Sequence, residues 1–98
     1  MQGSEKQIAW ANKIKEKVED IFLKIEVDYN FACSTLSYKK EPKRKIDVDS
    51  IFLATKSAYE AILKIDSAAW WIDEMKDFNI LDDFEYKYKR AVKKGFAK

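Results

Sequence analysis

A long uninterrupted stretch between Gly3 and Pro42 constrains this chain most, because no glycine or proline occurs inside it. Apolar residues recur there in steps of three and four, the spacing of one face of an α-helix. They are Ile8, Ala11, Ile14, Val18, Ile21, Phe22, Ile25, Tyr29, Ala32 and Leu36. Ser4 and Gln7 stand at the start of the stretch with the spacing of a capping box. The stretch therefore predicts one long N-terminal helix.

Part of this stretch also fits a strand. Residues 25–31, IEVDYNF, alternate apolar and polar side chains, the period of a half-buried strand. A partner strand could be residues 45–51, KIDVDSI, so a short β-hairpin 25–31/45–51 is the alternative to a helix here. A lone hairpin is marginally stable unless it packs on helices. We therefore favour the helix.

Further helices are predicted after residues 39–45, KKEPKRK, which Pro42 marks as a connection. They cover residues 50–65, residues 68–78 and the stretch that ends at Gly95. The expected N-terminal caps are Asp47 or Asp49, then Asp66 or Ser67, then Asn79 or Asp82, and Gly95 is the expected C-terminal cap. The predicted fold class is all-α: a single domain, residues 1–98, forming a small bundle of three to four helices.

The composition argues against an enzyme. The chain has no histidine, a single cysteine and two glycines, which removes the commonest general base, a thiolate metal site and a glycine-rich phosphate loop. Asp66, Asp73 and Asp77 could share a helix face and hold Mg²⁺, but a solvated acidic face is much the commoner arrangement. We expect no catalysis, no cofactor and no metal.

The same composition favours a cytoplasmic protein. Cys33 is alone and cannot form an internal disulfide, which fits a reducing compartment. No basic start followed by an apolar segment suggests a signal peptide. No apolar run approaches 18 residues, so no membrane contact is expected.

The three tryptophans are the candidate partner-binding residues. Trp70 and Trp71 are adjacent, and on a helix their side chains point about 100° apart. We expect one of them to anchor the core and the other to pack in a groove between helices or to show at the surface, where tryptophan is a favoured interface residue. The simpler alternative is that both are structural, because tryptophan is highly buried on average. Trp10, on the flank of the first helix, is expected to dock on one of the pair.

Two basic segments give an alternative function in nucleic-acid binding. Lysines and arginines beside a tyrosine could follow a phosphate backbone and stack one base. The candidate residues are Lys39, Lys40, Lys43, Arg44 and Lys45 in the connection, and Tyr86, Lys87, Arg90, Lys93 and Lys94 in the last helix. Against this function, the net charge is only +2, and a charge gradient that matches the helix dipole is common.

Two segments resemble a group of small phage and mobile-element proteins of bacteria. The opening GSEKQIAWANKI resembles the Gly-Ser-Glu-Lys-Gln, Ile or Val, Trp-Ala start of their first helix, and AAWWID resembles their Ala-x-Trp-Trp-Ile-Asp stretch. The resemblance covers about a quarter of the chain, and Lys15 and Met75 stand where that group has basic residues, arginine in the first case. It implies a mobile-element origin without an established activity.

These observations together predict a small non-catalytic binding protein. It would act through a protein–protein contact with a host or element-encoded factor, a defence factor among the candidates. The first alternative is the nucleic-acid accessory protein described above. The second is a self-assembling structural protein, in which spare aromatic surface is buried in a homodimer.

Overall fold

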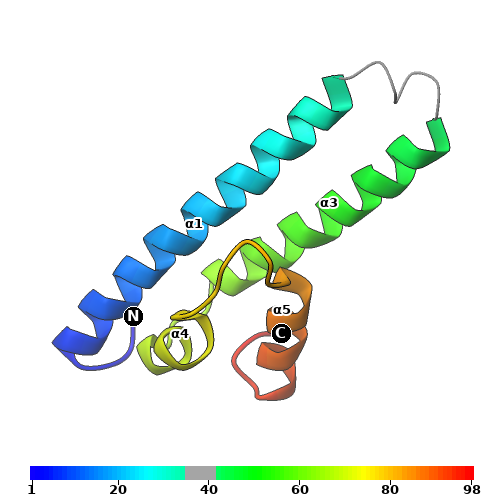
Figure 1. Ribbon diagram of the computed structural model, residues 1–98. Coiled ribbons are helices and arrows are strands. Elements are labelled where there is room, and N and C mark those ends of the chain that lie inside the picture. Colours follow the sequence, from blue (N-terminus) through cyan, green and yellow to red (C-terminus); the bar gives the residue numbers. More distant parts are fainter. Residues whose placement is uncertain (35–41) are drawn as a thin grey trace.

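The computed structural model describes residues 1–34 and 42–98, with side chains from residue 46 onward in the second stretch, and these residues form four helices (Figure 1). The helices are α1 (Glu5–Ser34), α3 (Pro42–Leu63), α4 (Ala68–Met75) and α5 (Phe84–Lys93). The all-α prediction and the long first helix are confirmed. The alternative hairpin is wrong: residues 25–31 and 45–51 are helical, and the described residues form no strand beyond one isolated bridge.

Local capping explains the start of α1. The Gln7 backbone N–H donates to Ser4 Oγ at 3.2 Å, and the Ser4 N–H donates to Gln7 Oε1 at 3.0 Å. This is the reciprocal pair of a capping box, as the sequence predicts.

The second helix begins earlier than predicted. It starts at Pro42, so Asp47 and Asp49 lie inside α3 and do not cap it. Proline is favoured in the first turn of a helix because its missing N–H has no helical partner there. Pro42 therefore opens this helix, where we had expected it only to mark a connection.

The last two helices follow the predicted pattern with one shift. Ser67 Oγ accepts from the Trp70 N–H and caps α4, as expected. Asp83 caps α5 in place of Asn79 or Asp82. Gly95 has a φ of +84° and follows α5, where its N–H donates to the Val92 carbonyl, so it ends the helix as predicted.

The molecule consists of a long helical hairpin with a two-helix cap at one end. Helices α1 and α3 run side by side, α4 packs on α1, and α5 packs on α3 (Figure 1). The buried residues of α1 lie between Ala11 and Phe22, and those of α3 and the following turn lie between Ala58 and Ile65. The rest of the hairpin, residues 23–34 with residues 46–57, extends beyond the cap and is called the arm below.

A series of aromatic rings connects the core to the arm. Phe22 stacks on Tyr59 with ring centroids 4.1 Å apart, and Phe84 of α5 meets both rings edge-on. Further along the arm, Tyr29 stacks on Phe52 at 4.1 Å. Stacked and edge-on aromatic pairs contribute beyond their buried area, so the rings hold α1 and α3 together, and the Tyr29–Phe52 pair does so in the arm, beyond the cap.

The chain start is also fixed to the cap. The Gln2 N–H donates to the Asp66 carbonyl at 2.8 Å, and the Ala68 N–H donates to the Gln2 carbonyl at 2.9 Å. Gly3 is required beside this contact, because a Cβ at its φ of +148° would lie 2.9 Å from Ala68 Cβ. The strap of residues 1–3 therefore lies across the start of α4.

Candidate protein-interaction surface

Trp70 and Trp71 are both buried, so the prediction that one of them is exposed is wrong. Their rings meet edge-on at 5.3 Å, and Trp71 Nε1 donates to the Ile65 carbonyl at 3.0 Å. The Lys15 ammonium lies 5.4 Å from the centre of the Trp71 ring. Helix α4 packs on α1 and contacts the turn that carries Ile65 through Trp71, and both tryptophan side chains are buried. The pair belongs to the core and offers no surface to a partner.

Trp10 is half exposed on α1. It makes no ring contact with either tryptophan in the part of the chain that the structure describes. The predicted contact between α1 and the Trp-Trp segment is nevertheless present, because α1 packs closely on α4. Of the three tryptophans, Trp10 alone is available at the surface.

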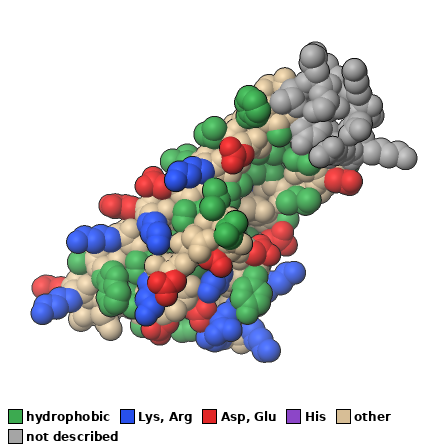
Figure 2. Space-filling view, in the orientation of Figure 1, with side chains coloured by type: hydrophobic (Ala, Val, Ile, Leu, Met, Phe, Trp, Pro, Cys, Tyr) green, Lys and Arg blue, Asp and Glu red, His purple; other side chains and the backbone are tan. Residues whose placement is uncertain are grey.

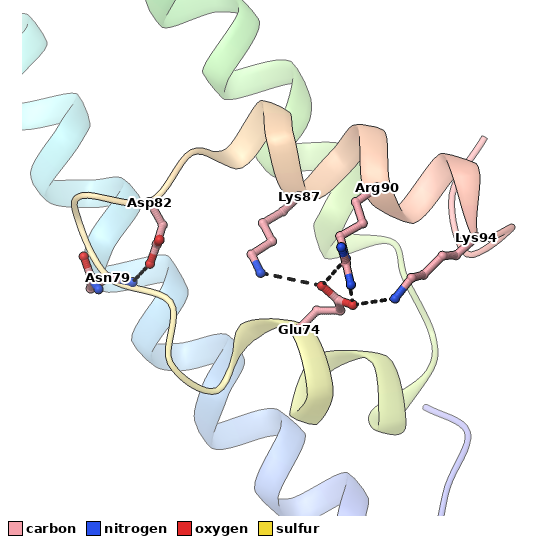
Figure 3. Close-up of polar contacts among 6 residues, drawn as sticks. All are labelled: Glu74, Asn79, Asp82, Lys87, Arg90 and Lys94. Carbon is pink, nitrogen blue, oxygen red and sulfur yellow. Dashed lines mark hydrogen bonds and ion pairs between the residues drawn. The ribbon is translucent and has the colours of Figure 1, made fainter.

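Two basic residues of α5 and Lys94, which directly follows it, converge on one carboxylate of α4 (Figure 3). Lys94 Nζ lies 2.8 Å from Glu74 Oε1, Arg90 Nε lies 3.0 Å from Oε2, and Lys87 Nζ lies 3.6 Å from Oε2. Partial burial raises the pKa of Glu74, but hydrogen bonds from Lys94 and Arg90 outweigh it, so the net pKa lies below its usual range. The hydrogen bond to Glu74 also raises the pKa of Arg90. These contacts tie the two cap helices together.

The predicted nucleic-acid residues therefore do not form one basic surface. Tyr86 and Lys93 are exposed, whereas Lys87, Arg90 and Lys94 pair with Glu74, although Arg90 and Lys94 remain partly exposed. Residues 43–45 lie in the first turns of α3, at the end of the hairpin far from α5 (Figure 1), and not in a loop. Lys39 and Lys40 lie outside the described residues.

The predicted acidic face does not gather into a metal site. Asp66 pairs with the Met1 ammonium at 3.1 Å, and Asp73 and Asp77 are exposed. Within residues 1–34 and 46–98, no three acidic or cysteine side chains are close enough to share an ion. Over the same residues, no helix is apolar along a length that could cross a bilayer.

A polar link that the sequence did not reveal lies between the two helices of the arm. The Tyr29 hydroxyl donates to Asp49 Oδ1, and Cys33 Sγ lies 3.9 Å from the same oxygen. The hydrogen bond to Asp49 raises the pKa of Tyr29 well above its usual value, because ionisation would remove the shared proton and place two anions together. Asp49, which we expected to cap a helix, connects α3 to α1.

Beside this link the arm has an open apolar groove of about 290 Å³. It lies between α1 and α3, beyond the end of the cap. The residues of this arm groove are Ile25, Asp28, Tyr29, Ala32, Val48, Ile51, Phe52 and Thr55. Ile51 is 65 % exposed although it stands at the centre of an apolar lining. The groove is the position that a third helix would fill in a bundle.

The arm as a whole is unusually apolar at its surface. Of the twelve most exposed large apolar residues in the described chain, six belong to it. They are Leu23, Val27, Phe31, Ile46, Ile51 and Leu53. Figure 2 shows such side chains along the arm between charged ones. Sequence periodicity could have indicated these residues, since Leu23, Val27 and Phe31 are spaced by four and fall outside the stripe assigned to the core.

Comparison with protein-family models, curated proteins and solved structures finds no match to this chain.

Proposed function

We propose that this protein is a non-catalytic binding protein whose arm groove receives an apolar segment of another protein. The observation that carries the proposal is Ile51, a large apolar side chain left 65 % exposed between two helices that no third helix covers within the described residues. Amphipathic helices bind in apolar grooves of this kind. The lining combines the carboxylate of Asp28 with the rings of Tyr29 and Phe52 and with aliphatic side chains, which suits an apolar helix face with a basic flank.

The partner is proposed to be a host protein or a factor encoded by the same mobile element, a defence factor included. The support for this choice is the resemblance of residues 3–14 and 68–73 to phage and mobile-element proteins. A nucleic-acid role ranks second, because three of the cations required for it are paired with Glu74. The proposed working place of the protein is the cytoplasm, as its single cysteine suggests.

The test is a comparison of three immobilised proteins in a bacterial lysate: the wild type, Ile51→Glu and Leu53→Glu. Leu53 is the matched control, because it is 60 % exposed on the same helix but lies outside the groove lining. Loss of a central interface anchor costs about 2 kcal/mol or more, so retention of the partner should fall at least about 10-fold with Ile51→Glu. The control should retain the partner as the wild type does.

Two results would contradict the proposal. One is a set of retained proteins that is the same for Ile51→Glu and the wild type. The other is a wild type that retains nothing beyond what an unrelated helical protein retains. Circular dichroism of each variant establishes that the helices are intact, which is expected because both side chains already face water.

A further inference from the structure

A second apolar surface lies on the outer side of α1, the side turned away from α3. Its residues, called the outer stripe below, are Leu23, Val27 and Phe31 of α1 with Ile80 from the α4–α5 connection. The first three are spaced by four, so they lie along one face of the helix. Lys24 and Asp28 border the same shallow hollow of about 320 Å³. The α4–α5 connection borders this surface through Ile80, and Leu23, Val27 and Phe31 each remain more than half exposed.

We propose that a second copy of the chain occupies the outer stripe and that two arms pair in antiparallel orientation about Val27. The apolar residues of this surface are not those of the arm groove, and only Asp28 borders both, so the proposal does not rest on the proposed function. A two-fold interface must be self-complementary, and the outer stripe has this property. When Val27 lies on the two-fold axis, Leu23 of one copy faces Phe31 of the other, and the same contact repeats on the other side of the axis.

The charges beside the stripe are also self-complementary in this orientation. Lys24 and Asp28 lie on the same flank of α1, one on each side of Val27. Antiparallel pairing at the usual interaxial distance of about 8–10 Å brings Lys24 of each copy towards Asp28 of the other. Parallel pairing would instead place this flank of the two copies on opposite sides of the interface, so that Lys24 of one copy could not approach Asp28 of the other. The charge order therefore selects the antiparallel dimer.

The exposed area is close to what a dimer requires. The exposed fractions are 54 % for Leu23, 64 % for Val27, 71 % for Phe31 and 48 % for Ile80. With roughly 150–200 Å² for each large side chain, the outer stripe exposes about 400 Å². Leu81, the next residue, is 92 % exposed and adds to it. A standard interface buries about 800 Å² per partner, of which roughly 60 % is apolar, so the stripe supplies most of the apolar part.

The shape of the molecule permits this pairing. Helices α4 and α5 lie at one end of the hairpin (Figure 1), so antiparallel arms keep the two caps at opposite ends. The chain is 53 Å long and 24 Å by 18 Å across. Pairing along the arm would widen the elongated molecule. It would also bury the outer surface of the arm, which has no buried residue in the described chain.

The test is analytical ultracentrifugation of the full chain from about 1 to 300 µM, a range that resolves micromolar dissociation constants. The wild type should convert from monomer to dimer. Val27→Asp places two carboxylates at the two-fold axis and should raise the dissociation constant at least about 30-fold. Leu53→Asp is the matched control, with similar exposure on α3, and should associate as the wild type does.

A charge exchange tests the orientation. Lys24→Asp and Asp28→Lys should each weaken the dimer, and the double variant should restore it, because the opposite charges then face each other again. A wild type that stays monomeric at the highest concentration would overturn the proposal, as would a dimer that Val27→Asp leaves unchanged. Ile51→Glu should dimerise normally and Val27→Asp should retain the groove partner, so the failure of one proposal is distinguishable from the failure of the other.

Discussion

Two adjacent tryptophans of α4 have different polar environments although both are buried. Trp71 Nε1 donates to the Ile65 carbonyl, whereas Trp70 Nε1 is buried without a hydrogen-bond partner in the described chain. A buried donor without a partner costs free energy, and a satisfied one contributes modestly. The indole N–H of Trp71 therefore stabilises the folded protein, whereas that of Trp70 destabilises it.

Replacement of each tryptophan by phenylalanine should expose this difference. Trp71→Phe loses the hydrogen bond and leaves the Ile65 carbonyl unpaired, whereas Trp70→Phe removes a donor that has no partner. Both variants lose similar apolar area, so the free energy of unfolding should fall by about 1–2 kcal/mol more in Trp71→Phe. Urea denaturation followed by circular dichroism measures it. An equal or larger loss in Trp70→Phe would contradict this assignment.

At the scale of the elements, Glu74 holds α4 and α5 together. Its carboxylate accepts from Arg90 and Lys94, and the pKa of Glu74 is lowered in the folded protein. The unfolded chain therefore binds a proton more readily than the folded one. The stabilisation from Glu74 is complete above its ordinary pKa of 4.5 and is lost as the pH falls through the lowered folded-state pKa.

Glu74→Gln should reduce the free energy of unfolding at pH 7 by about 1–2 kcal/mol, because hydrogen bonds to a charged group are lost while the cations can still be hydrated. The difference from the wild type should shrink as the pH is lowered below 4.5. Thermal unfolding at several pH values measures both effects. Glu16→Gln, on the exposed side of α1, is the matched control. If Glu74→Gln lowers the free energy of unfolding no more than this control does, Glu74 does not stabilise the contact between α4 and α5.

Features that depend on residues close together in the sequence were easier to predict than features that depend on residues far apart in it. Caps are local, so the Ser4–Gln7 pair and Gly95 were predicted correctly and Ser67 was one of two candidates, but the starts of α3 and α5 were assigned to the wrong residues because the helix boundaries were misplaced. Glu74 has its partners 13, 16 and 20 residues later in the chain, and no local pattern relates them. The burial of both tryptophans likewise depends on α1, which lies more than 35 residues away at its nearest point.

At the scale of the whole molecule, stability is unevenly distributed along the hairpin. All buried residues of α1 and α3 lie in the half beside the cap, and the described part of the arm contains none. Helix packing rules predict that α1 and α3 pair, but the apolar positions 23, 27 and 31 could equally have faced a fourth helix. Which apolar residues of α1 and α3 become buried depends on where α4 and α5 pack against the hairpin.

Amide hydrogen exchange should follow this division. Amides of residues 25–33 and 46–55 should exchange faster than those of residues 11–22 and 58–63, because few buried contacts oppose local opening of the arm. The comparison is made by NMR or mass spectrometry at low protein concentration, where monomers predominate. Uniform protection along both helices would show that the hairpin opens only together with the core.

The distance along the chain between α1 and its main packing partner affects how the protein folds during synthesis. The apolar face of α1 is complete at Phe22, but it packs on α4, which ends at Met75. At about 5–20 residues per second, the ribosome needs roughly 3–10 s to make the intervening residues. Throughout that interval the part of α1 that packs on α4 has no partner, although α3 can already pair with α1 once it is made. The segment translated first is therefore the last to have its apolar face completely covered.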